Sequence, residues 1–366
     1  MTTGDPAEEE TVRLLRAMLS IPSVSGDEAR LAAFLAEWMT GLGMTAWVDA
    51  AGNAHGVAGP PDAPTVLLLG HLDTVPGAVP NLRVGDLLYG RGAVDAKGPL
   101  AAMIVAASRS RTVRAHVVGA VGEEVPGSRG ARHLLETLPA PDAVVIGEPS
   151  GWDGICLGYK GRVGVVYRVD KPLLHTSSPE PTAVEDAVAF CDLVRDHLRR
   201  HSDGTDPVSF DTAAATLVEL RGDLGHAEAF LTCRVPPGFD FDLFERRLGG
   251  HSAGVTAFDE RVPAVRRPPG DPVARALRAA VRAQGGTPVL KLKAGTSDMN
   301  VVDAWHVPMA AYGPGDAHLD HTSDEHIAVA DLTRAVAVLD TALARLGGLL
   351  GAKATVGAGT AGRGAG

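Results

Sequence analysis

The chain has 366 residues, 45% of them hydrophobic, which is enough for a large core and for two or three domains. Its formal net charge of −10 argues against nucleic acid and anionic membranes as partners. No apolar run reaches the ~18 residues of a membrane span, and the acidic start MTTGDPAEEE lacks the apolar core of a signal peptide. Three widely spaced cysteines offer neither a disulfide framework nor a CxxC metal site, so we expect a cytoplasmic protein.

The first part of the chain predicts alternating helices and strands. Asp5-Pro6 opens a helix, and Ser25 to Glu28 is typical of a capping box for a second helix that ends near Gly43. Further strands are expected at 65–70, 113–121 and 142–147, and helices at 98–109 and 128–138. Because these strands are almost wholly apolar, the alternation predicts an α/β fold with a mostly parallel sheet flanked by helices.

After about residue 155 the pattern becomes that of an α+β domain. Strands are expected at 161–170, 213–220, 227–235 and 253–259, and helices at 182–200 and 241–248. From about 270 the chain returns to the first pattern, with helices at 272–284 and 326–348 and strands at 288–291 and 308–312. We therefore predict a catalytic domain in two parts, 1–156 and 268–350, an inserted lid and dimerisation domain, 157–267, and a disordered Gly/Ala-rich tail, 351–366.

Three apolar strands end in side chains of the kind that bind metals. The ends are His71 and Asp73 in TVLLLGHLD, Glu123 and Glu124 in VVGAVGEE, and Glu148 in DAVVIGEP, while GRGAVDAKG places Asp95 in a loop before a helix. Each alone has an ordinary interpretation, as a hydrogen-bonded histidine, a solvated turn or a helix cap. Charges at the tips of apolar strands are costly unless paired or metal-bound, and ligands of open α/β sheets bind at the carboxyl ends of strands. Together they favour one common site.

Imidazole nitrogens and carboxylate oxygens suit a hard or borderline dication. GDAHLDHTSDEHI offers a further histidine ligand, which is His318, His321 or His326. GRGAVDAKG is superficially similar to a phosphate loop but lacks its residue order, and GxSxG is absent. Nucleotide binding and serine hydrolase chemistry therefore have little support.

Five motifs occur in the order and spacing of a known family. GHLDTVPG, GRGAVDAKG, GEEVPGSRG, VIGEPS and HTSDEHI resemble the dinuclear zinc amidohydrolases, which include acetylornithine deacetylase, succinyl-diaminopimelate desuccinylase, aminoacylase and glutamate carboxypeptidases. The resemblance implies two zinc ions per subunit, which cobalt can replace, and hydrolysis of a linear amide bond by a shared, activated water. It assigns metal binding to His71, Asp95, Glu124, Glu148 and His321, general base catalysis to Glu123, and orientation of His71 to Asp73.

The resemblance also assigns roles outside the metal ligands. HTSSP is similar to a lid motif whose histidine, here His175, donates to the oxyanion from the partner subunit, which implies a homodimer. Arg234 resembles an arginine that contacts a substrate carboxylate, and Lys160 and Arg162 are expected to meet acidic groups near the mouth of the site. Gly295, Thr296 and Ser297 resemble a substrate-binding loop.

GYKGRVG after GEPS most resembles the lysine-biosynthesis branch of the family. Those enzymes release lysine or ornithine from the γ-glutamyl end of a small acidic amino-group carrier protein. The alternative is a deacylase of acetylornithine, acetyllysine or succinyl-diaminopimelate, followed by a metal-dependent dipeptidase, tripeptidase or carboxypeptidase. A metal-binding protein without catalysis is the alternative from another class.

Overall fold

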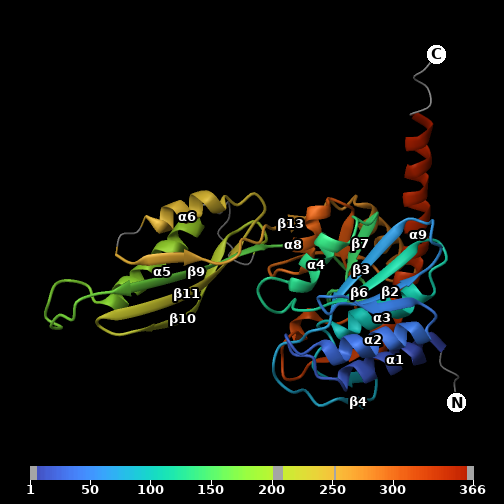
Figure 1. Cartoon of the computed structure of the whole chain (residues 1–366), viewed down its shortest axis with the longest axis horizontal. Helices are drawn as coiled ribbons and strands as arrows, with labels where there is room; N and C mark the ends of the chain where they lie inside the picture. The colour runs from blue at the N-terminus through green and yellow to red at the C-terminus, as the bar shows by residue number, and fades with distance from the viewer. Residues whose placement is uncertain (1–5, 201–208, 251–252, 361–366) are drawn as a thin grey trace. The chain divides into compact units, whose positions relative to one another are not determined.

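The computed structural model describes residues 6–200, 209–250 and 253–360. The chain forms two compact units (Figure 1), and each has its own apolar core. Unit 1 comprises Met1–Leu157, Arg267–Lys291 and Ser297–Gly366, and unit 2 comprises Gly158–Arg266 and Leu292–Thr296.

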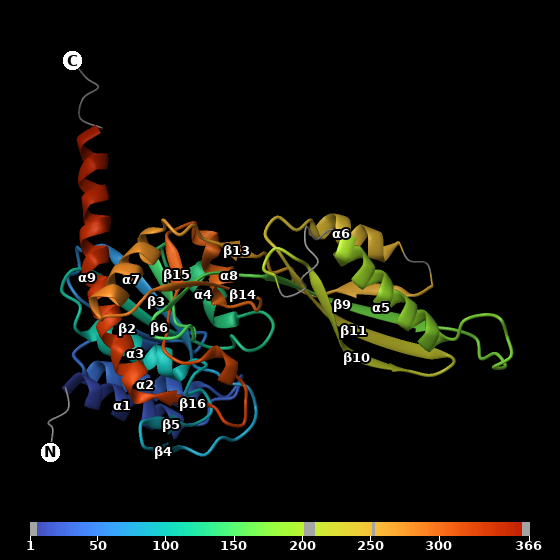
Figure 2. The same cartoon turned by 180° about the vertical axis from the view of Figure 1, so that it is seen from behind.

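Unit 1 is built on a mixed sheet with the strand order β1-β2-β6-β3-β7-β15-β8. Strands β6, β3, β7 and β15 are parallel, and β2 and β8 run antiparallel to their neighbours in this group. The strands are β1 (Thr45–Val48), β2 (Ala54–Ala58), β3 (Thr65–His71), β6 (Arg114–Ala120), β7 (Ala143–Ile146), β8 (Gly154–Tyr159) and β15 (Met309–Ala311). A strand such as TVLLLGH is apolar on both faces because helices cover both sides of the sheet (Figure 2).

One helix of unit 1, α3, is buried along almost its whole length. Helix α3 is buried from Lys97 to Ala107 and packs against α1, α9 and strands β2, β3 and β6. Its small residues allow this close approach, and at Gly98 an added Cβ would lie 2.3 Å from the carbonyl oxygen of Ala93. The helices are α1 (Pro6–Leu19), α2 (Ala29–Gly41), α3 (Lys97–Ser108), α4 (Arg129–Thr137), α7 (Pro272–Ala283), α8 (Asp298–Val302) and α9 (Val329–Thr360), with 3₁₀ turns at Asp303–Trp305 and Ala317–Leu319.

A small antiparallel sheet completes unit 1. Its order is β16-β5-β4, formed by β4 (Leu82–Val84), β5 (Leu87–Tyr89) and β16 (His326–Ala328). The pairing of β16 with β5 brings together two segments more than two hundred positions apart, since His326 lies opposite Tyr89.

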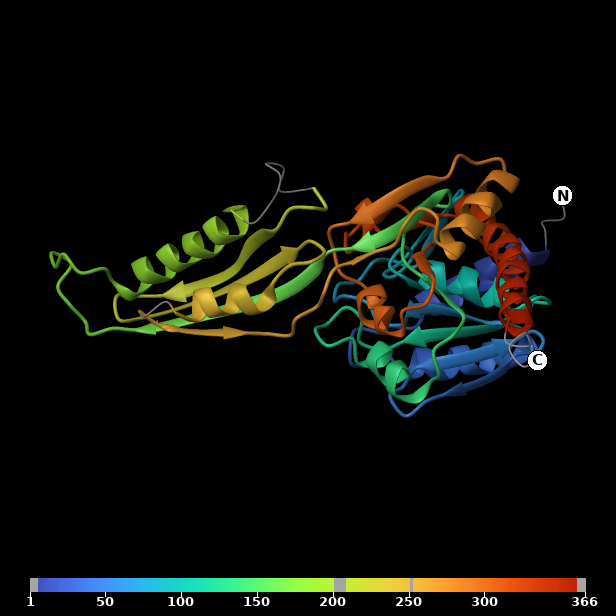
Figure 3. The ribbon, with the colours of Figure 1, turned by 90° about the horizontal axis from the view of Figure 1, so that it is seen from above.

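Unit 2 is an antiparallel sheet of order β10-β11-β9-β12 with helices on one face (Figure 3). Alternate side chains of β9 are buried, among them Val163, Val165 and Tyr167, because only one face of this sheet is covered. The elements are β9 (Gly161–Asp170), α5 (Ala183–Arg200), β10 (Ala214–Gly222), β11 (His226–Val235), α6 (Phe241–Gly249), β12 (Val255–Phe258) and β13 (Val265–Arg266). Strands β8 and β14 (Val289–Lys293) carry the chain across the boundary between the units. The predicted α/β fold with a separate α+β part is confirmed.

One local expectation is wrong. Ser25 and Glu28 do not form a capping box: the hydroxyl of Ser25 donates to Oδ2 of Asp73, and no side chain caps α2. The carboxylate of Glu28 is buried and accepts from the backbone N–H of Gly122 and from Arg129. Long-range contacts thus compete successfully with a local cap.

At the end of the chain, helix α9 extends to Thr360, into the Gly/Ala-rich segment 351–366. Disorder of this segment stays a prediction. Residues 361–366 lie outside the described residues. Within the described part of the chain, no helix has the length and apolar character needed to cross a bilayer.

Candidate metal centre

The carboxyl ends of β3, β6 and β7 meet at one edge of the central sheet. Strand β3 pairs in parallel with both neighbours, so His71 at its end lies beside the segment that follows Ala120 and the segment that follows Ile146. These two segments carry Glu123 and Glu148. The strand ends predicted from the sequence to supply ligands therefore converge.

Asp95 lies between two histidines. Its Oδ1 is 3.1 Å from Nε2 of His71, and its Oδ2 is 3.1 Å from Nε2 of His321. Nε2 of His321 also lies 3.0 Å from Oε1 of Glu124, and Nε2 of His71 lies 3.9 Å from Oε1 of Glu148. One carboxylate thus faces two sets of ligand-type atoms, one on each of its oxygens.

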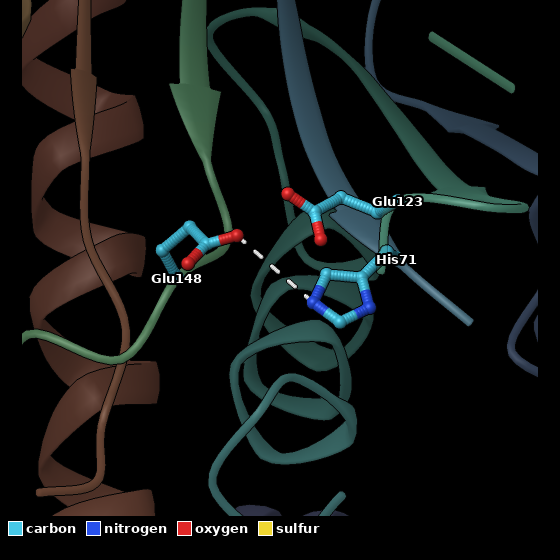
Figure 4. Close-up of side chains that lie close together, drawn as sticks. All are labelled: His71, Glu123 and Glu148. Atoms are coloured by element: carbon cyan, nitrogen blue, oxygen red, sulfur yellow. Dashed lines mark ion pairs between the residues drawn. The ribbon is translucent and has the colours of Figure 1, made fainter. Parts of the chain in front are cut away.

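Two groups in the described chain have the composition of a cation site. One comprises His71, Glu123 and Glu148, whose carboxylates face the imidazole in Figure 4, and the other His71, Asp95 and Glu124. In each group, one atom from every residue lies within 4.8 Å of the others. Imidazole nitrogens and carboxylate oxygens are the donors that zinc and similar dications take from proteins, so these side chains fit such ions.

His71 is held in one tautomer by a backbone carbonyl. Its Nδ1 lies 2.9 Å from the carbonyl oxygen of Asp73, which can only accept, so Nδ1 carries the proton and Nε2 is left to bind a cation. The Asp73 carboxylate is farther from the ring, with Oδ1 at 3.7 Å from Nδ1. The expected carboxylate–histidine bond is thus replaced here by a bond from the same residue's main chain.

The Asp73 carboxylate instead anchors the loop after β6. Its side chain is completely buried, and it accepts from the backbone N–H groups of Glu123 and Glu124 at 3.0 Å each and from the Ser25 hydroxyl at 2.7 Å. Asp73 therefore fixes the backbone positions from which the side chains of Glu123 and Glu124 extend.

The clustered carboxylates dominate the electrostatics of this site. Burial lowers the pKa of His71, but the hydrogen bond with Asp95 and other nearby carboxylates raise it well above its usual value. Hydrogen bonds with Asp95 and Glu124 raise the pKa of His321 to about 10. Burial, together with neighbouring carboxylates, raises the pKa of Glu123 well above its usual value. A site that favours protonation this strongly also favours a bound cation, because both reduce the same repulsion.

Of the three late histidines, only His321 faces the acidic cluster. It lies in the left-handed region with φ of 63°, after the 3₁₀ turn that contains His318. Nδ1 of His326 instead lies 2.6 Å from the carbonyl oxygen of Asp324, and its ring packs on Tyr89.

Residues expected to contact substrate have varied surroundings. In unit 2, His175 is exposed and its Nδ1 lies 2.9 Å from the Ser177 hydroxyl, while Nη1 of Arg234 donates to Oγ1 of Thr296 at 3.0 Å. Arg162 pairs with Asp259. In unit 1, the buried Ser297 hydroxyl caps α8 by accepting from the N–H of Met299.

Lys160 does not fit the expectation of a charge at the mouth of the site. It is 1% exposed, and its Nζ donates to the carbonyl oxygen of Thr212 at 2.8 Å. At Gly295 no heavy atom lies within 4 Å of the position that a Cβ would take.

Sequence reasoning missed two buried carboxylates near the centre. Glu325 is completely buried and binds the segment that contains Asp95. Asp298, at the start of α8, is 3% exposed, and burial raises its pKa to about 7. Glu325 lies in the motif HTSDEHI, and Asp298 directly follows the predicted substrate-binding loop of Gly295, Thr296 and Ser297. Neither position carries a local signal that distinguishes a buried acid from a solvated one.

A second cluster of titratable side chains, also in unit 1, was not predicted from the sequence. His55 and His116 are buried side by side, with Asp49 next to His55 and Trp47 stacked on the His55 ring. It lies on β2 and β6, away from the carboxyl ends that carry the candidate ligands.

Comparison with known proteins gives a family. The sequence pattern described as peptidase family M20/M25/M40 matches residues 67–345. A LysW-lysine hydrolase of Deinococcus radiodurans is 44% identical, covering 94% of this chain and 99% of its own. A LysW-lysine/LysW-ornithine hydrolase of Saccharolobus islandicus is 29% identical, covering 73% of this chain and 77% of its own. The crystal structure of the M20 metallo-carboxypeptidase Sso-CP2 from Sulfolobus solfataricus has a TM-score of 0.77 at 19% identity, covering 92% of this chain and 99% of that one, which is a likeness of fold. The chain therefore belongs to peptidase family M20/M25/M40.

Proposed function

We propose that this protein hydrolyses the amide bond between lysine, or ornithine, and the γ-carboxyl group of the terminal glutamate of an amino-group carrier protein. The observation that carries the proposal is the 44% identity to a relative named LysW-lysine hydrolase, which extends over 94% of this chain. The convergence of His71, Asp95 and Glu124 supports a metal-dependent reaction.

We assign two zinc ions to the centre, with cobalt able to replace them. His71, Asp95 and Glu148 would form one site, called here the His71 site. Asp95, Glu124 and His321 would form the other, the His321 site. The support is that each oxygen of Asp95 lies 3.1 Å from a different imidazole. When bound, the two ions would lower the pKa of a water and polarise the carbonyl of the scissile amide.

Glu123 is the proposed general base. Glu123 is the chain neighbour of Glu124, and its backbone N–H donates to the Asp73 carboxylate. The two oxygens of Asp95 face His71 and His321. Glu123 takes a proton from the attacking water and then gives it to the departing amine, so one carboxylate serves both halves of the reaction.

The lid supplies further proposed contacts, and we expect the protein to act as a homodimer. His175 would donate to the developing oxyanion from the partner subunit; its exposure on a loop of unit 2 supports an intermolecular role. Arg234 and Thr296, which are hydrogen-bonded to one another, would bind the carboxylate of the substrate.

A substrate panel tests this function. Purified protein loaded with zinc or cobalt is assayed with carrier-linked lysine, carrier-linked ornithine, acetylornithine and a dipeptide, and kcat/KM is compared. We expect the highest value for a carrier-linked substrate. A preference for acetylornithine would instead assign a free acyl-amino-acid deacylase, and a preference for the dipeptide a peptidase. No hydrolysis by the fully loaded protein would indicate a metal-binding protein without catalysis.

A further inference from the structure

One buried carboxylate, that of Glu325, accepts hydrogen bonds from the backbone of the segment that carries Asp95. Oε2 of Glu325 accepts from Nη1 of Arg91 at 2.8 Å and from the N–H of Gly92 at 3.0 Å. Its Oε1 accepts from the N–H groups of Val94 at 2.9 Å and Asp95 at 3.1 Å. The side chain is completely buried, so water does not compete for these bonds. Charge-assisted bonds of this kind are about twice as strong as neutral ones.

The same residue is tied to the segment that carries His321. Glu325 follows His321 by four positions and directly precedes β16. Strand β16 pairs with β5, and His326 lies opposite Tyr89. The 90–95 segment directly follows Tyr89, so it begins at the same end of the pairing as Glu325. The carbonyl oxygen of Glu325 also accepts from the N–H of Gly90. Main chain and side chain of one residue therefore join two ligand-bearing segments.

The surroundings of Glu325 leave it little freedom to move. Arg91, which neutralises it, is itself fixed by a bond from Nε to the carbonyl oxygen of Gly77 at 3.1 Å. The buried ammonium group of Lys97, which interacts electrostatically with Glu325, donates to the carbonyl oxygens of Met18 and Ile21, at 3.2 and 2.9 Å. The Glu325 carboxylate thus lies in a polar network that includes the 91–95 segment. Its burial is explained by these bonds, without a contact to substrate.

We propose that Glu325 is a positioning residue that fixes Asp95 relative to His321 and thereby sets the cation affinity of the His321 site. The inference rests on the two cation sites of the proposed function. The two sites differ in how they depend on Glu325. The His71 site contains one ligand held by this carboxylate, Asp95. The His321 site contains two ligands whose relative placement runs through it, Asp95 and His321.

The asymmetry gives an expected result for Glu325→Gln. The amide has the shape of the carboxylate but one of its two heads cannot accept, so up to two of the four bonds are lost. Groups that orient metal ligands typically change metal affinity by about 10- to 100-fold. We expect the affinity of the His321 site to fall at least about tenfold and that of the His71 site by clearly less.

The test is cation binding by the full-length protein stripped with a chelator. Zinc is titrated calorimetrically and Co²⁺ by its visible spectrum, so neither readout needs substrate. Asp271→Asn is the matched control, because Asp271 is also a buried carboxylate of unit 1 that accepts two backbone N–H bonds, from Val273 and Met309. The control is expected to lower the free energy of unfolding without changing the ratio of the two affinities.

Each outcome decides the proposal. An unchanged ratio of affinities in a folded Glu325→Gln protein overturns it, as does an equal loss at both sites. If that variant does not fold, Arg91→Met decides, since it removes one donor and leaves the carboxylate; the ratio must then shift in the same direction by a smaller factor. Wild-type protein that takes up a single cation would refute the two-ion assignment itself, which is a different failure from an unaltered ratio.

Discussion

Nδ1 of His55 lies 3.0 Å from Nε2 of His116, so a single proton is held between two buried imidazole rings. Nε2 of His55 lies 2.9 Å from Oδ2 of Asp49, a carboxylate that accepts, so His55 donates to Asp49 and accepts from His116. Both rings are neutral in this arrangement. Burial lowers the pKa of both, and that of His116 falls to about 4 with further contributions from His55 and Arg114.

This pair predicts a loss of stability in mild acid. The pKa of His116 is lower in the folded chain than the usual 6.5, so its contribution is fully present above that pH and is lost as the pH falls toward about 4. Between pH 7.5 and 5 the free energy of unfolding should fall by about 2 kcal/mol from this residue alone. Urea unfolding of wild type and His116→Gln at both pH values measures it. The same pH dependence in both proteins would show that His116 does not carry the effect.

Exchange of two neighbouring glutamates should separate catalysis from metal binding. Glu123→Gln removes the proposed base but no ligand, so we expect both cations to remain and kcat to fall by about 10²- to 10⁴-fold. Glu124→Gln alters a proposed ligand, whose Oε1 lies 3.0 Å from Nε2 of His321, and we expect loss of one cation. Metal content by elemental analysis, measured beside kcat, distinguishes the two. Loss of metal from Glu123→Gln would place this residue among the ligands instead.

Asp95 and Glu148 should differ in how many cations depend on them. Asp95 faces both His71 and His321, so Asp95→Ala should weaken both sites, whereas Glu148→Gln should weaken the His71 site alone. Titration of the chelator-treated proteins with Co²⁺ gives the number of ions bound. One tightly bound ion in Asp95→Ala would refute a shared carboxylate.

Asp73 should matter for stability beyond its position beside His71. Asp73→Asn keeps the size of the side chain but places an N–H donor opposite one of the two backbone N–H groups, those of Glu123 and Glu124, that bind separate oxygens of the carboxylate. Loss of a bond to a buried charge costs about 2 kcal/mol, so the free energy of unfolding should fall by at least that amount. Ser25→Ala removes one hydroxyl donor but leaves the carboxylate and both backbone N–H bonds, so it should cost no more than about 2 kcal/mol and less than Asp73→Asn. Equal costs for the two variants would contradict the role of Asp73 as an anchor.

Much of the fold could be predicted because its signals are local. The apolar run that ends at His71 (β3) and the run before Glu148 (β7) read as buried strands, and their parallel pairing with one another explains why charged ends far apart in sequence converge. The change to alternating burial after residue 160 similarly marks the separate antiparallel sheet. The periodicity of apolar residues and the ends of strands depend on residues that are neighbours in the chain, so both can be read from the sequence.

What the sequence did not reveal depends on distant partners. Ser25 and Glu28 have the spacing of a helix cap, yet their side chains bind Asp73 and the segment after β6. Lys160 looks like a surface charge and is buried. Glu325 looks like one more acid in an acidic motif, and its four donors lie 230 to 234 positions earlier. Such contacts follow from topology, which a single sequence does not encode locally.

The contact between Glu124 and His321 joins residues 197 positions apart. As the protein is made on the ribosome, β3, β6 and β7 can assemble early, but the last imidazole emerges only after the whole of unit 2 has been synthesised. A nascent chain therefore exposes an incomplete acidic cluster, and the two cations that we propose could both bind only near the end of translation or after release.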